Sequence, residues 1–394
     1  MTVIFSFDIT LPVWILLGVS LLPVLWLLSV YRCRVTAVGK AASSSPDAMP
    51  MIADTDYPEV SIVVYSTGEP ARLEALLGDI FGQDYPVDME VIVVNDGKIP
   101  EIKGVVERMR ASHHNLYITF TPPDVRNLSR RKLALTLGIK AARKGVVVLT
   151  DDCCAPASDW WLRMMTAPFA DSSVQMVIGH AYPDSDSGFG SSGRRFSLGA
   201  DAVEYMSAVL RGRTYRANGH NLAYRTRLFF ENKGFSRSLN LHDGDDDLFV
   251  SEVSRPGNTV LVASPGAHMA VWHADTRRAY RQEKTRRSFT GRMLRQGTRL
   301  FFGFSTLLMW LWLAAAVAAS VLAWPNASVA AAELVMALIF WIPLSLTWKR
   351  TLRSLSIQVS VWSIPWRLLM RPVTTLRFRL RASRHKSEHY TWKN

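Results

Sequence analysis

The stretch Val146-Val-Val-Leu-Thr-Asp-Asp-Cys-Cys-Ala-Pro156 changes character in its middle. Four apolar residues come first, and two carboxylates and two thiols follow almost directly. A short apolar run bounded by residues of this kind is typical of a buried strand. The acidic pair should therefore lie just beyond the carboxyl end of that strand, which is where open α/β sheets bind their ligands.

Similar patterns come before this stretch along the chain. Short strands are expected at residues 60–64, 91–94 and 116–120, and helices at residues 71–81 and 130–143. Apolar strands that alternate with helices are typical of a parallel sheet covered by helices on both faces. The fold class predicted for the middle of the chain is therefore α/β.

Acidic side chains follow the ends of these strands, namely Glu69, Asp96, Asp151 and Asp152. A single Asp after a strand usually makes a turn or caps a helix, but three such positions at one sheet edge predict a shared crevice. Carboxylates suit a hard divalent ion, and Mg²⁺ is usually held by one or two of them together with substrate phosphates. The chain lacks both a G-x-x-x-x-G-K-[ST] loop and a G-x-G-x-x-G after a strand, so neither a P-loop nor a Rossmann site is expected.

Three segments are apolar enough to cross a membrane. Residues 9–31 carry no charge, residues 300–323 repeat the pattern, and residues 330–348 are a weaker candidate because Glu333 lies near their start. The first segment is expected to be a retained anchor rather than a cleaved signal peptide, because no basic region precedes it and its apolar run is long.

Basic residues beside these segments indicate their orientation. Lys and Arg cluster at residues 32–40, 292–299 and from Lys349 onward, whereas residues 324–329 have none. Positive flanks favour the cytoplasmic side. The sequence therefore predicts a multi-pass protein of a bacterial-type inner (plasma) membrane, with the α/β domain and the C-terminal tail in the cytoplasm.

The formal net charge of +13 is concentrated near the C-terminus. Residues 349–394 hold eleven Lys and Arg against Glu388 alone, interleaved with Trp and Phe. Basic and aromatic residues beside a membrane span are typical of a segment on anionic lipid headgroups. No nucleic-acid recognition motif accompanies the charge, so nucleic acid is not an expected partner. Two of the three cysteines are adjacent, which is unlike a disulfide framework and fits a reducing cytoplasm.

Composition divides the chain into six parts. The expected organisation is a membrane anchor at 1–35, a linker at 36–56, the α/β domain at 57–270, basic interfacial helices at 271–299, two membrane helices at 300–348 and a basic amphipathic tail at 349–394.

Over residues 57–293 the sequence resembles the membrane-bound family 2 glycosyltransferases, the group that includes cellulose and hyaluronan synthases. Several motifs in order carry this resemblance: 60–64 (VSIVV), 81–86 (FGQDYP), 90–97 (EVIVVNDG), 129–138 (SRRKLALTLG), 149–156 (LTDDCCAP), 219–225 (GHNLAYR) and 244–248 (GDDDL). Each motif is weak by itself, and the ordered set is specific.

The resemblance implies a GT-A fold that binds a nucleotide-diphospho-sugar and Mg²⁺ or Mn²⁺, and transfers the sugar with inversion. On the donor side, Arg131 and Lys132 would stabilise the leaving diphosphate beside Glu69, Asp96 and Asp152. The family's D-x-D metal motif aligns with Asp151 and Cys153, so that Asp152 takes the variable place. A thiolate is softer than the ligands that Mg²⁺ or Mn²⁺ prefers, so the metal would rest mainly on Asp151 and the phosphates, or Asp152 would substitute.

The same resemblance assigns the acceptor side. It implies Asp246 as the base that accepts the proton of the acceptor hydroxyl, with Asp245 selected instead by a different gap placement. Residues 219–225 imply acceptor contacts from Asn221, Tyr224 and Arg225. The family's Q-x-x-R-W segment matches only residues 283–287, with Arg286 in place and its Trp absent, so long-chain polymerisation is less expected.

The leading hypothesis is a glycosyltransferase that modifies a lipid-linked or polysaccharide acceptor at the membrane. The first alternative is a processive synthase that exports its polymer and would need a homodimer, because three spans make a poor channel. The second is a membrane scaffold that keeps the fold without catalysis, which the Cys153 replacement makes conceivable.

Overall fold

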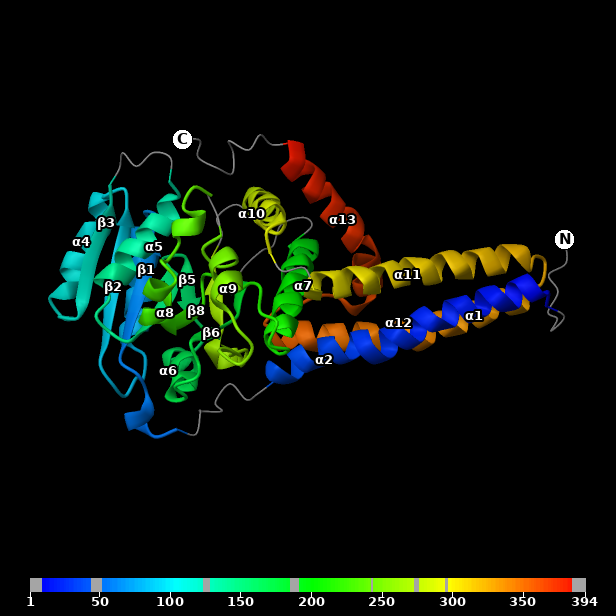
Figure 1. The fold of residues 1–394 in the computed structure, drawn as a ribbon, viewed down its shortest axis with the longest axis horizontal. Coiled ribbons are helices and arrows are strands. Elements are labelled where there is room, and N and C mark those ends of the chain that lie inside the picture. The colour runs from blue at the N-terminus through cyan, green and yellow to red at the C-terminus, as the bar shows by residue number, and fades with distance from the viewer. Residues whose placement is uncertain are drawn as a thin grey trace.

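The computed structural model describes residues 9–43, 52–122, 128–184, 191–241, 244–272, 276–294 and 297–384. Figure 1 shows an α/β domain at one end of the molecule and a bundle of long helices at the other, with α7, α10 and α13 between them. Part of the predicted linker and the end of the predicted basic tail lie outside the described residues.

A seven-stranded sheet forms the centre of the α/β domain, in the order β3-β2-β1-β4-β8-β6-β9. Its strands are β1 (Val60–Ser66), β2 (Met89–Asp96), β3 (Leu116–Thr121), β4 (Val146–Asp151), β6 (Met176–Ile178), β8 (Leu222–Arg225) and β9 (Thr259–Leu261). The four predicted strands β1 to β4 are present and parallel. Strand β8 runs antiparallel to β4, so the sheet is mixed rather than wholly parallel.

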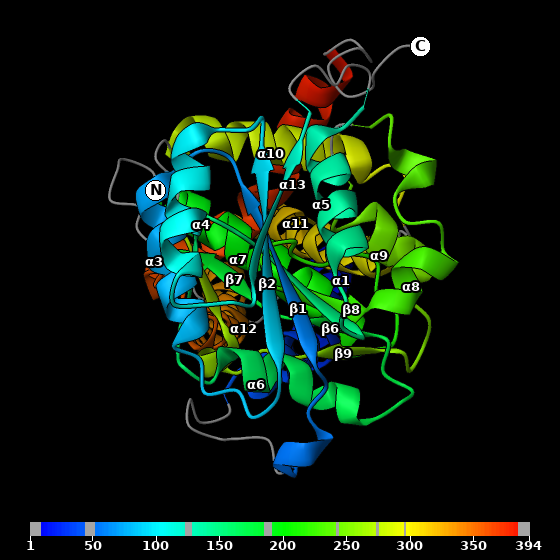
Figure 2. The same cartoon turned by 90° about the vertical axis from the view of Figure 1, so that its left-hand side faces the viewer.

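Helices cover both faces of this sheet, as expected for strands that are apolar throughout. Side chains of α3 (Pro70–Phe81) and α4 (Pro100–Arg110) pack with Ile62 and Val64 of β1 on one face. Side chains of α5 (Arg130–Ala141) pack with Val63 on the other face. Alternate residues of β1 therefore pack into two separate hydrophobic cores, one on each face of the sheet. Figure 2 shows α4 and α5 on either side of β1 and β2.

Smaller elements complete the α/β domain. They are β5 (Cys154–Pro156), β7 (Ala181–Pro183) and β10 (Met269–Val271), which form a second sheet, and the helices α6 (Trp161–Thr166), α8 (Thr226–Glu231) and α9 (Leu248–Val253). Strand β5 follows β4 after two residues, which turns Cys153 and Cys154 back toward β10.

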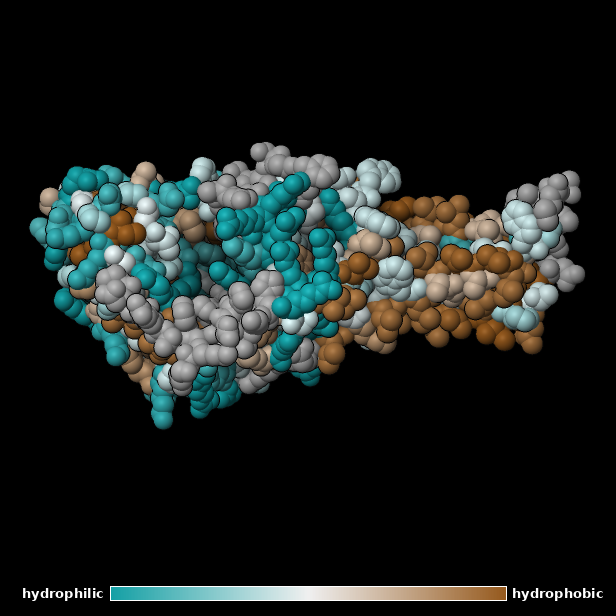
Figure 3. Space-filling view, turned by 90° about the horizontal axis from the view of Figure 1, so that it is seen from above, coloured by the Kyte–Doolittle hydropathy of each residue, from teal (hydrophilic) through white to brown (hydrophobic). Residues whose placement is uncertain are grey.

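Among the described residues, three helices have the length and composition needed to cross a membrane, which confirms the three predicted apolar segments. The first is continuous through α1 (Leu11–Trp26), a π-helical turn and α2 (Arg32–Ala41), and the others are α11 (Gly297–Leu322) and α12 (Ala327–Ser354). Their surface is a hydrophobic band in Figure 3. Glu333, which weakened the third prediction, is buried and accepts a hydrogen bond of 2.8 Å from Ser20 Oγ of α1.

The predicted linker begins later than expected. Helix α2 continues through Ala41 because Val35 and Val38 are buried in the core that it shares with α7 (Ser191–Val209) and α12. Gly39 permits this close packing, since a Cβ there would lie 2.5 Å from Thr351 Oγ1 of α12. The prediction of a linker from residue 36 was wrong because alanine-rich and serine-rich composition gives no sign of a tertiary partner.

Two basic helices lie where the domain meets the bundle. Helix α10 (Thr276–Thr290) falls within the predicted interfacial segment, and α13 (Ile364–Arg384) falls within the predicted amphipathic tail. These two helices pack against each other, and α13 also packs against α11 and α12. They join the α/β domain to the membrane-spanning bundle.

Candidate active site

Arg131 links two of the predicted acidic positions. Its Nη1 and Nη2 atoms lie 2.6 and 3.0 Å from the two carboxylate oxygens of Asp151, and its Nε lies 2.8 Å from Asp245 Oδ2. Asp151 is the last residue of β4, and Arg131 is the second residue of α5. The carboxyl end of a strand and the amino end of a helix therefore meet here. Burial opposes ionisation of Asp151, but Arg131 and His220 hold the pKa of this carboxyl well below its usual range.

His220 completes a second cluster on the other side of Asp151. Its Nε2 lies 3.3 Å from Asp151 Oδ2, and ligand atoms of His220, Cys153 and Cys154 all lie within 4.8 Å of one another. A hydrogen bond from Cys154, together with His220, lowers the pKa of Cys153 to about 5 against the effect of burial. Burial also opposes the charge on His220, yet Asp151 and Cys153 raise its pKa to about 10. The cluster therefore holds a thiolate beside an imidazolium.

Asp96 gathers its own partners at the neighbouring strand end. It accepts hydrogen bonds from Tyr65 Oη at 2.8 Å and from Arg130 Nη2 at 2.7 Å, and also from Thr121. Tyr65 lies opposite Asp151 in the register of β1 and β4, and its ring centroid is 4.9 Å from Arg131 Cζ. Tyr65 thus bridges the Asp96 and Asp151 positions, so the structure brings these two predicted acidic positions together at one sheet edge.

Asp246 occupies an environment unlike that of its neighbour Asp245. One carboxylate oxygen of Asp246 accepts the main-chain N–H of Gly219 at 3.2 Å. Burial and the charges of Asp245 and Asp247 raise the pKa of Asp246 to about 6, although Arg287 and Arg216 act in the opposite direction. Asp246 is therefore a carboxylate that titrates close to neutral pH.

Gly219 allows the two halves of the crevice to approach. A Cβ at this position would lie 3.2 Å from Asp246 Cβ, 3.3 Å from Asp245 Oδ2 and 3.4 Å from Arg131 Nη2. These distances are tighter than ordinary van der Waals contact. The glycine of the 219–225 motif is explained by this crowding.

A family profile decides the classification. Residues 21–394 match the profile of glycosyl transferase family 21. The chain belongs to this family.

Solved structures show the fold of this family 21 glycosyltransferase. A mannosyltransferase of Pyrobaculum calidifontis in complex with GDP-mannose and Mn²⁺ aligns with a TM-score of 0.53 and 19% identity, over 86% of this chain and 97% of that one. Glucosyl-3-phosphoglycerate synthase of Mycobacterium tuberculosis aligns with a TM-score of 0.38 and 15% identity, over 57% and 78% of the two chains. A search of the curated proteins finds no match. The predicted GT-A fold is confirmed, whereas the family is 21 and the resemblance to cellulose and hyaluronan synthases in family 2 is unconfirmed.

Three predicted donor-side residues of the family 21 chain, Lys132, Asp152 and Glu69, differ in their surroundings. The Nζ of Lys132 is buried and donates to the carbonyl oxygens of Ser238 and Leu241, at 2.6 and 3.3 Å. Asp152 Oδ2 accepts from Ser66 Oγ at 2.8 Å and from the main-chain N–H of Thr67 at 2.9 Å.

Burial raises the pKa of Asp152 despite the hydrogen bonds from Ser66 and Thr67. Glu69 is the third of these residues, and it is exposed just before the first turn of α3. Lys132 therefore holds a neighbouring segment of the chain, Asp152 also lines a small cavity with Cys153 and Cys154, and Arg131 is the cation that contacts both Asp151 and Asp245.

The predicted acceptor-side residues spread along β8. Asn221 is buried near the end of β4, where it accepts from Trp161 Nε1 at 3.0 Å and donates to two main-chain carbonyl oxygens. Tyr224 is buried among aromatic rings, and Arg225 pairs with Val146 at the opposite end of β4 from Asp151. The structure thus places Arg225 away from the site, whereas the Tyr224 ring is buried on the side where it interacts with the charge of Asp245.

Arg286 is exposed on α10, while the adjacent Arg287 faces a cavity that His220 also lines. Sequence reasoning selected Arg286 from its alignment and missed Arg287. It also missed His220, Arg130 and Tyr65, although the first two lie inside quoted motifs. A helical projection of α10 together with the strand-end rule for β1 would have pointed to Arg287 and Tyr65.

The donor atoms near Asp151 can be compared with the metal that the resemblance implied. Both oxygens of Asp151 contact Arg131, so ligation by this carboxylate requires Arg131 to move, for instance onto a diphosphate. The thiols of Cys153 and Cys154, and the imidazole that His220 would present after losing its proton to solvent, are softer ligands than Mg²⁺ prefers. This set fits a transition-metal ion better than Mg²⁺.

Proposed function

We propose that this family 21 protein transfers a sugar, with inversion, from a nucleotide-diphospho-sugar to a lipid-linked or polysaccharide acceptor at the membrane surface. The GT-A fold and the family support glycosyl transfer. The GDP-mannose held by the Pyrobaculum mannosyltransferase is consistent with a nucleotide-sugar donor here.

The difference between Asp245 and Asp246 carries this proposal. Asp245 is neutralised by Arg131 at 2.8 Å, whereas Asp246 accepts a main-chain N–H and has a pKa raised to about 6 by burial and adjacent carboxylates. A general base works best when its pKa lies near the working pH. Asp246 is thus the carboxylate suited to take the proton from an acceptor hydroxyl, and Asp245 positions Arg131.

Arg131 and Arg130 supply positive charge on the donor side. A diphosphate that leaves the sugar gains negative charge, and fixed cations placed where this charge develops lower the barrier. Arg131 lies between Asp151 and Asp245, and Arg130 lies on Asp96, so both guanidinium groups are held beside the acidic positions; Arg131 would move from Asp151 onto the diphosphate. A divalent transition-metal ion at Asp151, Cys153 and His220 would add Lewis-acid stabilisation of the same charge when bound.

The membrane-spanning helices support an acceptor held at a bilayer. Helices α10 and α13 pack between the α/β domain and the bundle, on the side where Asp246 and Arg287 meet. The basic flanks of the spans support a cytoplasmic position for this side, at a bacterial-type inner membrane. The acceptor would then approach along the membrane surface while the nucleotide sugar arrives from the cytoplasm.

A single-turnover assay of the purified full chain tests the function. A panel of nucleotide sugars is screened first with a membrane lipid extract, and the Asp246→Asn variant is then compared with the wild type at saturating donor. Transfer should fall about 10²- to 10⁴-fold, the range that general-base catalysis supplies. Donor binding should persist, because asparagine keeps the size of the side chain.

Asp88→Asn is the matched control, because Asp88 forms only a surface ion pair with Lys144. Transfer that is unchanged in the Asp246 variant would remove the base from the mechanism. Absence of transfer in the wild type with every donor, despite donor binding, would favour the scaffold alternative. A product that carries one added sugar, rather than a long polymer, would reject the processive alternative.

A further inference from the structure

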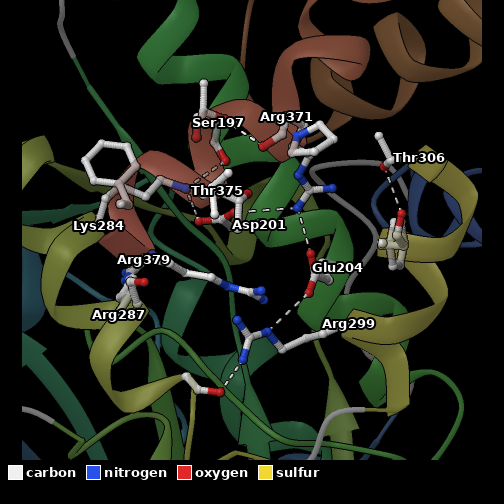
Figure 4. Close-up of a pocket in the computed structure, with 18 of the residues that line it drawn as sticks. Ser197, Asp201, Glu204, Lys284, Arg287, Arg299, Thr306, Arg371, Thr375 and Arg379 are labelled. Atoms are coloured by element: carbon white, nitrogen blue, oxygen red, sulfur yellow. Dashed lines mark hydrogen bonds and ion pairs between the residues drawn. The ribbon is translucent and has the colours of Figure 1, made fainter. Parts of the chain in front are cut away.

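A cavity of about 300 Å³ lies between α7, α10, α11 and α13, outside the crevice described above (Figure 4). Its charged lining is mostly cationic and comes from all of these helices and from the segment before β8. The cationic members are Arg216, Lys284, Arg287, Arg299, Arg371 and Arg379, and the acidic members are Asp201 and Glu204. The six cations therefore outnumber the two acids of the lining, and one of the cations, Arg287, also pairs with Glu283 of its own helix.

The two acids are already paired. Asp201 accepts a hydrogen bond from Lys284 and lies 3.6 Å from Arg371 Nη2, and Glu204 lies 2.6 Å from the same nitrogen. Arg299 reaches Glu204 only at 4.0 Å. Two carboxylates shared among three cations leave positive charge that the described lining does not neutralise.

Two guanidinium groups converge in the open part of the cavity. Figure 4 shows the side chains of Arg299 and Arg379 extending toward each other across it. Arg379 has no acidic partner among the residues that the structure describes. Arg216 adds a second observation, since its Nε is buried without a hydrogen-bond partner. Arg299 also donates to the main-chain oxygen of Gly291. Convergent guanidinium groups are the arrangement that binds phosphate oxygens.

The cavity lies at the end of a membrane span. Arg299 is in the first turn of α11, and Phe302 and Thr306 continue the cavity wall along the same face of that helix. Phe378 adds an apolar side chain from α13. Cationic groups near the domain and apolar groups toward the bundle match a phosphate head attached to a hydrocarbon chain.

The outer face of α13 fits this position at the headgroup level. Large apolar side chains recur at helical spacing and are 50% exposed or more: Trp366, Val373, Leu376 and Leu380, preceded by Trp362 at 89%. An exposed apolar stripe on a helix rich in arginine is typical of a helix in the membrane interface. One wall of the cavity would thus lie in the lipid headgroup layer.

We propose that this cavity binds the anionic phosphate head of a membrane lipid. A smaller cavity shares Asp201 and Arg287 with it and is also lined by Asn218 and His220, so the bound head lies beside the crevice that contains Asp246. This is the place of an acceptor lipid. The acceptor role rests on the glycosyl transfer proposed above, whereas binding of the phosphate head does not.

The test uses the full chain in a neutral detergent and measures binding without nucleotide sugar. Dihexanoyl phosphatidic acid is titrated by calorimetry, with dihexanoyl glycerol and inorganic phosphate as the two comparison ligands. The variant is Arg379→Gln, and Arg377→Gln is the matched control, because Arg377 is exposed on the same helix and does not line the cavity. A second variant, Arg299→Gln, tests the facing guanidinium.

Saturable binding of phosphatidic acid is expected, with dihexanoyl glycerol and inorganic phosphate both weaker. Arg379→Gln and Arg299→Gln should each raise the Kd about 10-fold, as expected for loss of one charged hydrogen bond. Equal weakening by Arg377→Gln would show unspecific charge attraction and overturn the proposal. Phosphate that binds as tightly as phosphatidic acid would overturn the lipid assignment. Phosphate-lipid binding with no transfer to any lipid would reject the proposed function and leave this cavity assignment intact.

Discussion

Adjacent carboxylates acquire different chemistry in this protein because their partners differ. Asp245 contacts a guanidinium, while Asp246 contacts a main-chain N–H and lies between two other carboxylates. The sequence identified the acidic run and left two positions open as the base. It could not decide the sign of the pKa shift, because burial and the approach of Arg216 and Arg287 are both tertiary effects.

The pH dependence of transfer should follow the ionisation of Asp246. A base must be deprotonated, so the single-turnover rate should rise tenfold per pH unit below about 6 and level off above it. The groups that set this midpoint are Asp245 and Asp247, which raise the pKa, and Arg287 and Arg216, which lower it. The measurement is a pH–rate profile at saturating donor.

Removal of one of these cations tests the assignment. Arg287→Gln should move the rising limb to higher pH, because it removes a charge that favours the carboxylate. Arg281→Gln, an exposed change on the same helix, should leave the limb in place. A limb that stays at the same pH in the Arg287 variant would mean that another group titrates.

As pH rises, ionisation of Asp246 should lower the stability of the folded protein while it raises the rate of transfer. The pKa of Asp246 is about 6 in the folded protein, above its unfolded value of about 3.9, so folding favours the protonated form. The associated stability is complete below pH 4 and is lost as pH rises through 6. Asp246→Asn should therefore raise the thermal midpoint by about 2–4 °C at pH 8 and have little effect at pH 4.

Differential scanning fluorimetry at the two pH values measures this effect. Asp88→Asn serves as the control for a surface carboxylate. A lower thermal midpoint for Asp246→Asn at pH 8 would show that the wild-type Asp246 carboxylate stabilises the folded protein, which contradicts this prediction.

Cys153 offers a test of metal preference. Its thiolate lies beside His220 at the place of the second Asp of a D-x-D motif. Cys153→Asp replaces a soft ligand by a hard one, so Mg²⁺ should support nucleotide binding better relative to Mn²⁺ or Zn²⁺ than in the wild type. Calorimetry with the preferred nucleoside diphosphate and each ion measures this ratio. Cys154→Ser should leave the ratio nearly unchanged, and equal shifts in both variants would make both thiols ligands.

At the scale of the element, strand β8 shows where motif reasoning ends. Its quoted motif places Asn221 near the catalytic edge and Arg225 about one strand length away, because the strand runs antiparallel to β4. A string of residues does not reveal the direction of a strand. The four parallel strands were predictable since each is an unbroken apolar run, and the crevice followed from their shared edge.

Arg225 should accordingly act on stability rather than on transfer. It donates to the main-chain oxygens of Val174, Phe169 and Asp171 at 2.8 to 3.0 Å. Hydrogen bonds to charged groups contribute about 1.5–3 kcal/mol each, so Arg225→Gln should lower the thermal midpoint by several degrees. Transfer per folded molecule should stay at the wild-type level.

Arg227→Gln is the matched control, because Arg227 is exposed and reaches Gln175 only at 3.4 Å. Thermal unfolding and specific activity are measured on the same preparations. A large loss of activity in Arg225→Gln without loss of stability would restore its predicted contact with the acceptor.

At the scale of the whole molecule, hydropathy predicted the membrane-spanning helices. Composition did not predict how the other helices pack against them. Long apolar runs are local features, so all three spans were predicted, although the first and third helices continue past the predicted ends to Ala41 and Ser354. The packing of α7, α10 and α13 around the basic cavity depends on contacts between residues more than 80 positions apart, such as Lys284 with Asp201. No periodicity in the sequence records such a contact.

The orientation of the bundle is open to direct test. A reporter fused after Asn394 or inserted near Ser44 should show cytoplasmic activity, since basic residues flank the spans on that side. A reporter inserted at Asn326, in the turn between α11 and α12, should give the opposite signal. Alkaline phosphatase and green fluorescent protein fusions at the three sites measure this, and a periplasmic signal after Asn394 would reverse the topology.

The contact between α11 and α12 also bears on the fate of the product. Trp312 packs against Phe340 with ring centroids 4.7 Å apart, and Met309 and Leu344 are buried in the same core. A hydrophilic sugar moving along this contact would have to displace these side chains and give up its hydration. A glycosylated lipid made by this protein would therefore stay in the leaflet where it was formed, and a separate flippase would have to carry it to the opposite side of the bilayer.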